Sequence, residues 1–340
     1  MDKLPLGKLP PGLLADLLAR HKPSDPRVLL GPGVGMDCAV LDFGESLLVA
    51  KSDPITFTAE DIGWYAVHVN ANDVATTGAQ PRWFMATVLL PEEKATPELA
   101  ATIFDQIAEA CQSVGAQLIG GHTEITTGLD RTIVAGTMLG EVMRERLITP
   151  RGTRLGDRIL LTKGVPIEAA SILAREFSTL LTELPSDVLS RASDYIHHPG
   201  ISVVREALAA SETGAVTAMH DPTEGGLASG LWELAQAANV GLLIDREAIQ
   251  IPSEAELICS ALGIDPLEAI ASGALLLTVK PEASERVCHA IDALGINVSE
   301  IGWVTESREV AMRTKKGSYT LPWPERDALA RLFEKTSTNG

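Results

Sequence analysis

Acidic side chains lie beside glycines and turn residues at several points of the chain, where a side chain can reach a cleft. Asp37 follows the glycine-rich stretch GPGVG, and Asp53 lies in KSDP. Glu124 ends the segment GGHTE, while Asp221 and Glu224 lie in HDPTEGG before an expected helix. Mg²⁺ takes one or two carboxylates together with phosphate oxygens. Carboxylates next to glycine loops therefore favour a metal–phosphate site, although each acid alone could instead fix a turn.

Asp73 is the most informative of these acids. It is the single acid between residues 62 and 80, and Asn70 and Thr77 lie on the same face of an expected helix. A carboxylate on a nearly uncharged helix loses solvation when it is buried, and a cation is its natural compensation. The alternative is that Asp73 hydrogen-bonds within its own domain.

Two further polar residues could take part in chemistry. His220 precedes Asp221 and is a candidate proton carrier, although a lone histidine can equally be structural. Lys163 lies in LTKG at the end of an expected strand, where its ammonium could meet phosphate or solvent. The chain contains no G-x-x-x-x-G-K-[ST], no G-x-G-x-x-G in a βαβ context and no G-x-S-x-G. The sequence thus argues against a P-loop, a Rossmann site and a serine hydrolase.

Charge and cysteine content narrow the class of protein. The chain has 340 residues and a net charge of −17, so it would repel nucleic acid and would need metal ions to hold a nucleotide. No apolar run reaches about eighteen residues, and we therefore expect no contact with membranes. Four scattered cysteines without a C-x-x-C pair, and an N-terminus without a signal-peptide pattern, predict a cytoplasmic protein with reduced thiols.

The order of expected elements predicts an α+β protein. We expect helices over residues 12–20, 61–77, 96–114, 165–177, 202–210, 226–238 and 283–294. We expect strands over residues 38–42, 47–51, 82–90, 116–119, 131–142, 158–162, 215–219, 240–244, 274–279 and 298–304. A polar, glycine-containing segment near residue 150 divides the chain into an N-terminal arm (1–30), a first domain (31–152) and a second domain (153–340).

Six ordered motifs resemble the aminoimidazole ribonucleotide synthetase superfamily. They are GVGMDCAVL, KSDP, DIGWYAVHVNANDVATTGAQP, GGHTE, GDRILLTKG and MHDPTEGGL, and they span about residues 30 to 310. The resemblance implies two α/β domains of the superfamily's type. It also implies an N-terminal mixed or antiparallel sheet that forms a dimer interface, a C-terminal α+β sandwich, and Mg-ATP in the cleft between the domains.

The resemblance assigns roles to single residues. It implies that Asp53 and Asp73 bind the metal and that Asp37 is the acid of the glycine-rich phosphate loop. We expect Mg²⁺ to bridge phosphate oxygens to all three aspartates. We expect the nucleotide contacts to come from Gly33, Gly35, Asp37, Asn70, Gly120, Gly121, Glu124 and Lys163. The predicted catalytic residues, on the acceptor side, are His220, Asp221 and Glu224.

The motif HDPTEGGL is similar to the HDPTRGGL of HypE proteins, with Glu224 in place of the arginine. HypE proteins end in Pro-Arg-Ile-Cys, whose thiol carries a carbamoyl group that ATP converts to a thiocyanate. This sequence ends in LFEKTSTNG, and its last cysteine, Cys288, lies inside an expected helix.

We therefore expect a homodimeric, Mg-ATP-dependent enzyme that phosphorylates an amide or carbamoyl-type oxygen in hydrogenase or other metalloenzyme maturation. The acceptor would be a small molecule or a carbamoyl group on a partner protein. The alternatives are a small-molecule kinase like thiamine-monophosphate kinase and a non-catalytic ATP-binding scaffold.

Overall fold

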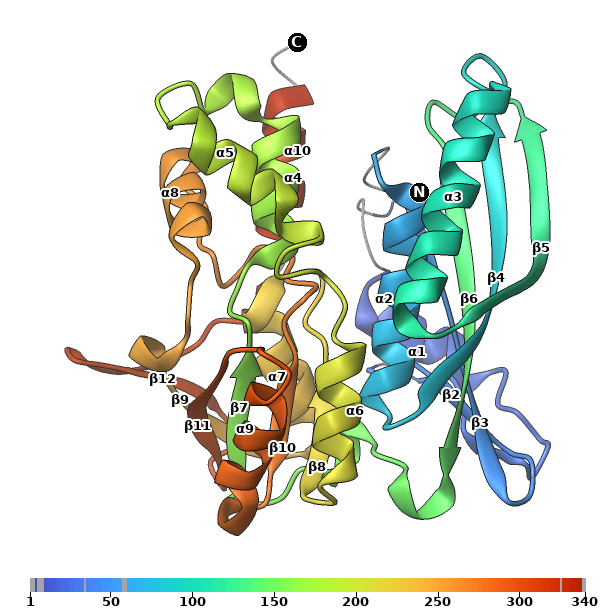
Figure 1. Ribbon diagram of the computed structural model, residues 1–340. Coiled ribbons are helices and arrows are strands. Elements are labelled where there is room, and N and C mark those ends of the chain that lie inside the picture. Colours follow the sequence, from blue (N-terminus) through green and yellow to red (C-terminus); the bar gives the residue numbers. More distant parts are fainter. Residues whose placement is uncertain (1–3, 5–8, 34, 57–59, 325, 338–340) are drawn as a thin grey trace.

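The computed structural model describes residues 4, 9–33, 35–56, 60–324 and 326–337. The chain forms two halves that lie side by side, each a sheet with its own helices (Figure 1). The first half contains α1 (Pro11–Ala19), β1 (Val28–Leu30), β2 (Ala39–Asp42), β3 (Ser46–Ile55), α2 (Ile62–Thr76), β4 (Gln80–Pro91), α3 (Pro97–Val114), β5 (Gln117–Thr126) and β6 (Ile133–Met143).

The six strands of the first half form a sheet in the order β1-β2-β3-β6-β4-β5. Neighbouring strands run antiparallel, except β4 and β5, which are parallel. Along β6 buried side chains such as Val134 and Met138 alternate with half-exposed ones. The buried set faces α2 and α3, and we call this side the inner face and the opposite side the outer face.

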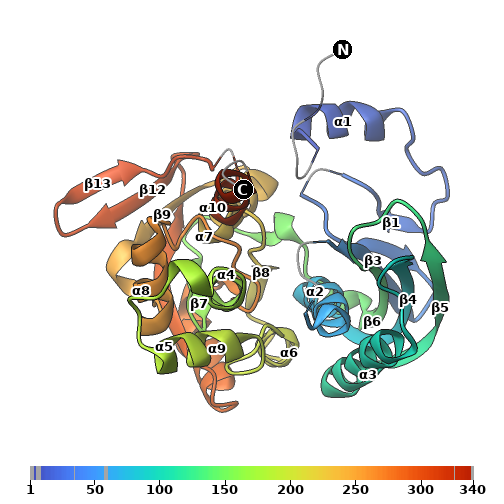
Figure 2. The same cartoon turned by 90° about the horizontal axis from the view of Figure 1, so that it is seen from above.

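Helix α2 is buried on nearly all sides because it lies between the first sheet, α3 and the second half (Figure 2). Asn72 joins it to the second half, because its side-chain amide donates to Ile201 O at 2.8 Å and accepts from Val203 N at 2.8 Å. We call this pair of hydrogen bonds the Asn72 clamp. The indole N–H of Trp64 also donates to the second half, at Ile196 O.

The second half contains a seven-stranded sheet in the order β13-β12-β9-β11-β7-β10-β8. Its strands are β7 (Arg158–Thr162), β8 (Val216–His220), β9 (Gly241–Asp245), β10 (Leu276–Val279), β11 (Val298–Thr305), β12 (Val310–Thr314) and β13 (Gly317–Thr320). Its helices are α4 (Ile167–Glu176), α5 (Ser186–Ser193), α6 (Val204–Glu212), α7 (Gly226–Ala238), α8 (Ser253–Leu262), α9 (Ser284–Asp292) and α10 (Ala328–Ser337). Helices α6 and α9 pack on one face of this sheet, and α7 packs on the other.

Local sequence explains where several elements begin and end. Thr96 caps α3, because its side chain accepts the Leu99 N–H at 3.1 Å, and Gly115 ends the same helix in the left-handed conformation. Gly226 at the start of α7 has a φ of 63°, and a Cβ there would lie 2.5 Å from the carbonyl oxygens of Leu267 and Ala269. The second glycine of HDPTEGG is therefore required by close backbone contact.

The structure confirms the α+β class and the expected helices and strands within a few residues. Two expected strand ends are wrong, because β3 continues to Ile55 and β5 continues to Thr126. Asp53 and Glu124 consequently lie inside strands. The sequence reading did not predict β1, α5, α8, β12, β13 or α10.

The first sheet ends with β6 and the second begins with β7, on either side of the predicted boundary at residues 152 and 153. Strand β1 places part of the predicted arm in the first sheet. Among the helices that the structure describes, none combines the length and apolar character needed to cross a membrane.

Candidate functional site

A buried lysine lies between two of the predicted metal ligands. The Lys51 Nζ is 2.8 Å from Asp73 Oδ2 and 3.1 Å from Asp53 Oδ2. The side chains of Lys51 and Asp73 are 11% and 7% exposed, and that of Asp53 is 41% exposed. The structure thus brings Asp53 and Asp73 together through an ammonium group.

Strand and helix geometry explains this arrangement. Lys51 and Asp53 are two residues apart on β3, so both side chains lie on the inner face, where α2 carries Asp73. The Asn70 side chain fixes the strand against α2. Its Oδ1 accepts the Asp53 N–H at 2.8 Å, and its Nδ2 donates to Asp53 O and Ala66 O. Both amide hydrogens of Asn70 are thus used within the protein, and its contact with the nucleotide stays a prediction.

The second half supplies two more predicted residues from the end of β8. The His220 Nδ1 is 3.8 Å from Asp37 Oδ2, and its Nε2 is 2.7 Å from Glu233 Oε2. Asp221 is buried, and its carboxyl interacts with that of Asp73. Four acids from four separate segments thus meet where the halves join, and we call them the carboxylate cluster: Asp37, Asp53, Asp73 and Asp221.

Burial and mutual repulsion shift the pKa values in this cluster. Burial raises the pKa of Asp73 to about 6, although the Lys51 ammonium acts in the opposite direction. Burial, together with Asp73 and Asp37, raises the pKa of Asp221 well above its usual range. Asp221 therefore keeps its proton to a higher pH than an exposed carboxyl does.

The two cationic groups respond in the opposite sense. Burial acts to lower the pKa of Lys51, but Asp73, Asp53 and Asp37 outweigh it and raise that pKa. For His220 burial is likewise outweighed, mainly by the hydrogen bond to Glu233, and the pKa of His220 is raised. Lys51 is a permanent cation, and His220 stays protonated to a higher pH than a free imidazole.

Lys163 lies in a different environment from the one predicted. Its Nζ is 2.8 Å from Glu206 Oε1, and it donates to the carbonyl oxygens of Gly200 and Ser202. The side chains of Lys163 and Glu206 are 4% and 1% exposed. Because the ammonium is engaged in the interior, the expected phosphate contact of Lys163 is not supported.

The GGHTE segment also lies away from the cluster. It belongs to β5, and β6 and β4 separate this strand from β3. Strand register places Gly120 and Glu124 opposite Met85 and Leu89, whose half-exposed side chains belong to the outer face. Glu124 contacts His122, with 3.2 Å between Oε2 and Nε2. Within one chain, Gly120 and Glu124 therefore lie on the opposite face of the sheet from Asp53 and Asp73.

Gly121, like Thr123, occupies a position on the inner face of the sheet. A Cβ at Gly121 would lie 1.9 Å from Ala86 O. This glycine is explained by the close approach of β4, without a ligand.

The remaining predicted residues lie at the two ends of the cluster. Gly33 and Gly35 belong to the loop before Asp37, where the Met36 N–H donates to Gly33 O and Gly35 has a φ of 74°. The charge of Glu224, like that of Asp327, acts on the buried Glu168.

The donor set fits a phosphate-bound Mg²⁺ better than a metal held by protein alone. The cluster offers oxygen ligands, and Asp221 Oδ2 is buried without a hydrogen-bond partner among the described residues. Within the described part of the chain, however, no three His, Cys, Asp or Glu side chains are close enough to hold a metal together. Asp37 and Asp53 are the partly exposed members and would hold Mg²⁺ together with phosphate oxygens.

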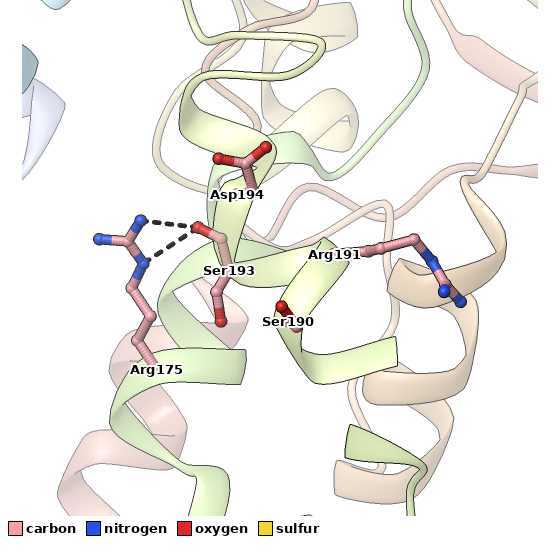
Figure 3. A pocket seen from close by; sticks show the side chains of 5 residues that line it. All are labelled: Arg175, Ser190, Arg191, Ser193 and Asp194. Carbon is pink, nitrogen blue, oxygen red and sulfur yellow. Dashed lines mark hydrogen bonds between the residues drawn. The ribbon is translucent and has the colours of Figure 1, made fainter. Parts of the chain in front are cut away.

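A wider surface hollow lies elsewhere, on the second half, and encloses about 450 Å³. It is lined by Arg175, Ser190, Arg191, Ser193 and Asp194 (Figure 3). Arg175 donates to Ser193 O and contacts Asp61, while Arg191 contacts Asp187 and Glu254. Since both guanidinium groups are already paired, this hollow offers no free cation to an anionic ligand.

Known protein families match both halves. Residues 35–142 match the N-terminal domain of AIR synthase related proteins, and residues 154–315 match their C-terminal domain. The chain belongs to the AIR synthase related family. A protein of Methanocaldococcus jannaschii, named for hydrogenase expression and formation, is 30% identical over 88% of this chain and 90% of its own length. The carbamoyl dehydratase HypE of Cupriavidus necator is 31% identical over 82% of this chain and 78% of its own.

Solved structures show the same two-domain fold. HypE in complex with ATP aligns with 93% of this chain and 95% of its own, at a TM-score of 0.71 and 24% identity. HypE in its complex with HypF aligns with 91% of this chain and 98% of its own, at a TM-score of 0.72 and 22% identity. Thiamine monophosphate kinase from Aquifex aeolicus aligns with 91% of this chain and 97% of its own, at a TM-score of 0.69 and 19% identity. At these identities the likeness establishes the AIR synthase fold, which serves more than one reaction.

The sequence reading missed two residues of the site. Lys51 lies inside the quoted motif KSDP, and its alternation with Asp53 on a strand was the signal that could have placed it on the same face. Glu233, the partner of His220, carries no such signal, because a helix and a strand bring the pair together from positions thirteen residues apart.

Proposed function

We propose that this chain binds Mg-ATP at the carboxylate cluster and uses it to dehydrate a carbamoyl group in hydrogenase maturation. The observation that supports this most directly is the meeting of Asp73 from the first half with Asp221 from the second. Relatives named carbamoyl dehydratase HypE span most of the chain, and HypE has been solved with ATP. A nucleotide lying across the junction would meet acids from both halves.

Bound Mg²⁺ would neutralise charge on the phosphates, which an acidic chain could not do alone. The chain's own residues prepare the place for it. Asn70 fixes the backbone of Asp53, and His220 lies beside Asp37, whose carboxylate the protonated imidazole would orient. The raised pKa of Asp221 favours its protonated form, which would relieve repulsion next to Asp73. The residues so far placed on the acceptor side, His220 and Asp221, thus act at the nucleotide end of the site.

The proposed dehydration of the carbamoyl group has two steps. The carbamoyl oxygen takes the γ-phosphoryl group of ATP, and ADP leaves. The C–O bond then breaks with release of phosphate and of both N–H protons, and the carbamoyl carbon becomes a nitrile. Phosphorylation turns a poor leaving oxygen into a good one, which is the energetic purpose of the ATP.

The cysteines of this sequence do not place a carbamoyl group at the site by themselves. Cys111 and Cys259 are buried in helices α3 and α8, and Cys288 is half-buried in α9. Cys38 lies beside Asp37, but burial raises its thiol pKa far above the usual range. We therefore propose an acceptor that is a small molecule or a carbamoylated partner protein. The solved complex of HypE with HypF supports a protein partner.

The test is turnover with a defined acceptor. The protein is incubated with Mg-ATP and a peptide that carries an S-carbamoyl cysteine, and ADP, phosphate and peptide mass are followed. We expect ADP and phosphate together with loss of one water from the peptide. A phosphate that stays on the acceptor would instead identify a kinase. Nucleotide binding without ADP release on any carbamoyl acceptor would identify a scaffold.

We further propose that the outer face of the first sheet forms a homodimer. Helices cover its inner face, whereas the outer face is half-exposed along β3, β4 and β6, and Met143 at the end of β6 is 51% exposed. Thr87, in the middle of β4, belongs to this face. Thr87→Arg should convert a dimer to a monomer in light scattering after size exclusion, and a dimer that persists would contradict this interface.

A further inference from the structure

The ammonium group of Lys51 occupies the space between Asp53 and Asp73. It lies 3.1 Å from one carboxylate and 2.8 Å from the other, and 11% of the side chain is exposed. These distances are those of charge-assisted hydrogen bonds. Lys51 enters from β3 and Asp73 from α2, and Asn70 fixes Asp53 by two backbone hydrogen bonds. The contact is therefore built by several elements and does not depend on one mobile side chain.

The two carboxylates of Asp53 and Asp73 need a cation between them even when no ligand is bound. Asp73 is nine-tenths buried, and a buried carboxylate without a partner costs several kcal/mol. Among the described residues no three metal-ligating side chains lie close enough together to hold one ion. These acids are therefore not arranged as a cage around a metal. The position that a shared cation would take between Asp53 and Asp73 is filled by the lysine.

We propose that Lys51 is a resident cation, which keeps free divalent metal out of the Asp53–Asp73 pair and presents a fixed positive charge to an incoming phosphate. A divalent ion at the same place would be repelled by the ammonium and would find both carboxylates in use. Metal would then enter with the nucleotide, on Asp37 and the outer side of Asp53. The exclusion of free metal stands independently of the proposed reaction, whereas the contact with phosphate rests on it.

Mn²⁺ binding without nucleotide tests the first part. Free Mn²⁺ is measured by electron paramagnetic resonance against the wild-type chain, Lys51→Met and Lys51→Arg. Lys94→Met is the control, because Lys94 is an exposed lysine that donates to Asp130 O. We expect Lys51→Met to bind Mn²⁺ at least about tenfold more tightly than the wild type, and the arginine and control variants to resemble the wild type. Equal affinity in Lys51→Met and the wild type would overturn the proposal.

A second measurement covers the case in which Lys51→Met does not fold. The wild-type chain alone should bind no Mn²⁺ that Asp73→Asn removes. A tight Mn²⁺ ion in the wild type that is lost in Asp73→Asn would show that Lys51 does not keep metal out, and would overturn the proposal without the lysine variant.

Nucleotide binding in EDTA tests the second part. We expect metal-free ATP to bind the wild type with an affinity that falls at least about tenfold in Lys51→Met and is retained in Lys51→Arg, as measured by calorimetry. Equal metal-free affinities would overturn the phosphate contact. Failure of every variant to bind ATP even with Mg²⁺ would contradict the proposed function and leave the Mn²⁺ result unaffected.

Discussion

Two buried lysines of this chain make almost the same contact and have different consequences. Lys51 Nζ and Lys163 Nζ each lie 2.8 Å from a carboxylate oxygen. Lys163 and Glu206 form a neutral pair that is completed by two carbonyl oxygens and is almost fully buried. Lys51 instead faces more acids than it can balance, and one of them, Asp53, is partly exposed. A buried ion pair is a structural link when its charge is balanced, and a binding site when charge is left over beside an opening.

The balanced pair of Lys163 and Glu206 should contribute strongly to the stability of the fold. Glu206→Gln leaves the Lys163 ammonium buried without its counter-ion, and should lower the free energy of unfolding by about 3–5 kcal/mol. Urea denaturation followed by tryptophan fluorescence measures this loss. The control is Asp187→Asn, which removes an exposed partner of Arg191 and should cost far less stability than Glu206→Gln. Equal losses in the two variants would contradict a structural role for the Lys163 pair.

Glu168 is a buried acid like Asp73 and Glu206, but no cation contributes to its pKa shift. Burial raises the pKa of Glu168 to about 7, from a usual value near 4.5. The unfolded chain therefore releases this proton at lower pH than the folded chain. The free energy of unfolding should fall by about 3 kcal/mol as the pH rises from about 4.5 to about 7.

Glu168→Gln should remove this fall, so that the variant matches the wild type near pH 4.5 and exceeds it near pH 8. Denaturation of both chains at several pH values measures the difference. A wild-type curve that stays parallel to that of Glu168→Gln across this range would show that Glu168 is ionised in the folded chain.

Asp73→Asn tests the unbalanced pair. The change should weaken Mg-ATP binding by at least about tenfold, or about 1.4 kcal/mol, because Asp73 positions the Lys51 ammonium that is proposed to meet the phosphate. It should change stability by less than about 1 kcal/mol, because Lys51 keeps Asp53 and the neutral amide is easier to bury than a carboxylate. Calorimetric titration and urea denaturation of the same preparation give both numbers. A stability loss like that of Glu206→Gln, with unchanged nucleotide affinity, would mean that the two lysine pairs have been assigned the wrong way round.

The smallest effect concerns His220. Glu233→Gln removes the hydrogen bond that chiefly raises the pKa of His220, so burial should then bring that pKa down. A proton-detected NMR titration of the imidazole follows the shift. If His220 titrates identically in both chains, the Glu233 contact does not control its charge.

Sequence alone predicted the fold and the acids but not their neighbours. The helical stretch from residue 61 to 77 and the acids Asp37, Asp53 and Asp73 follow from local patterns and from ordered motifs. The face on which each GGHTE residue lies could not be predicted, because it depends on the continuation of β5 past Ile119 and on its register with β4. Lys163 was misplaced because its partner, Glu206, lies forty-three residues further along the chain. Pairings of this kind depend on tertiary packing, and local composition contains no record of them.

Asn72 and Asp73 are consecutive residues of α2 that make different kinds of contact. Asn72 holds the loop of the second half, whereas Asp73 holds the Lys51 ammonium of the first sheet and meets Asp221. The second half therefore cannot move away from α2 at this point unless the Asn72 clamp breaks. The Val203 N–H is one of its donors, and it becomes accessible to solvent when the clamp opens. Deuterium exchange at this single amide thus reports how often the two halves separate beside Asp73 and Asp221.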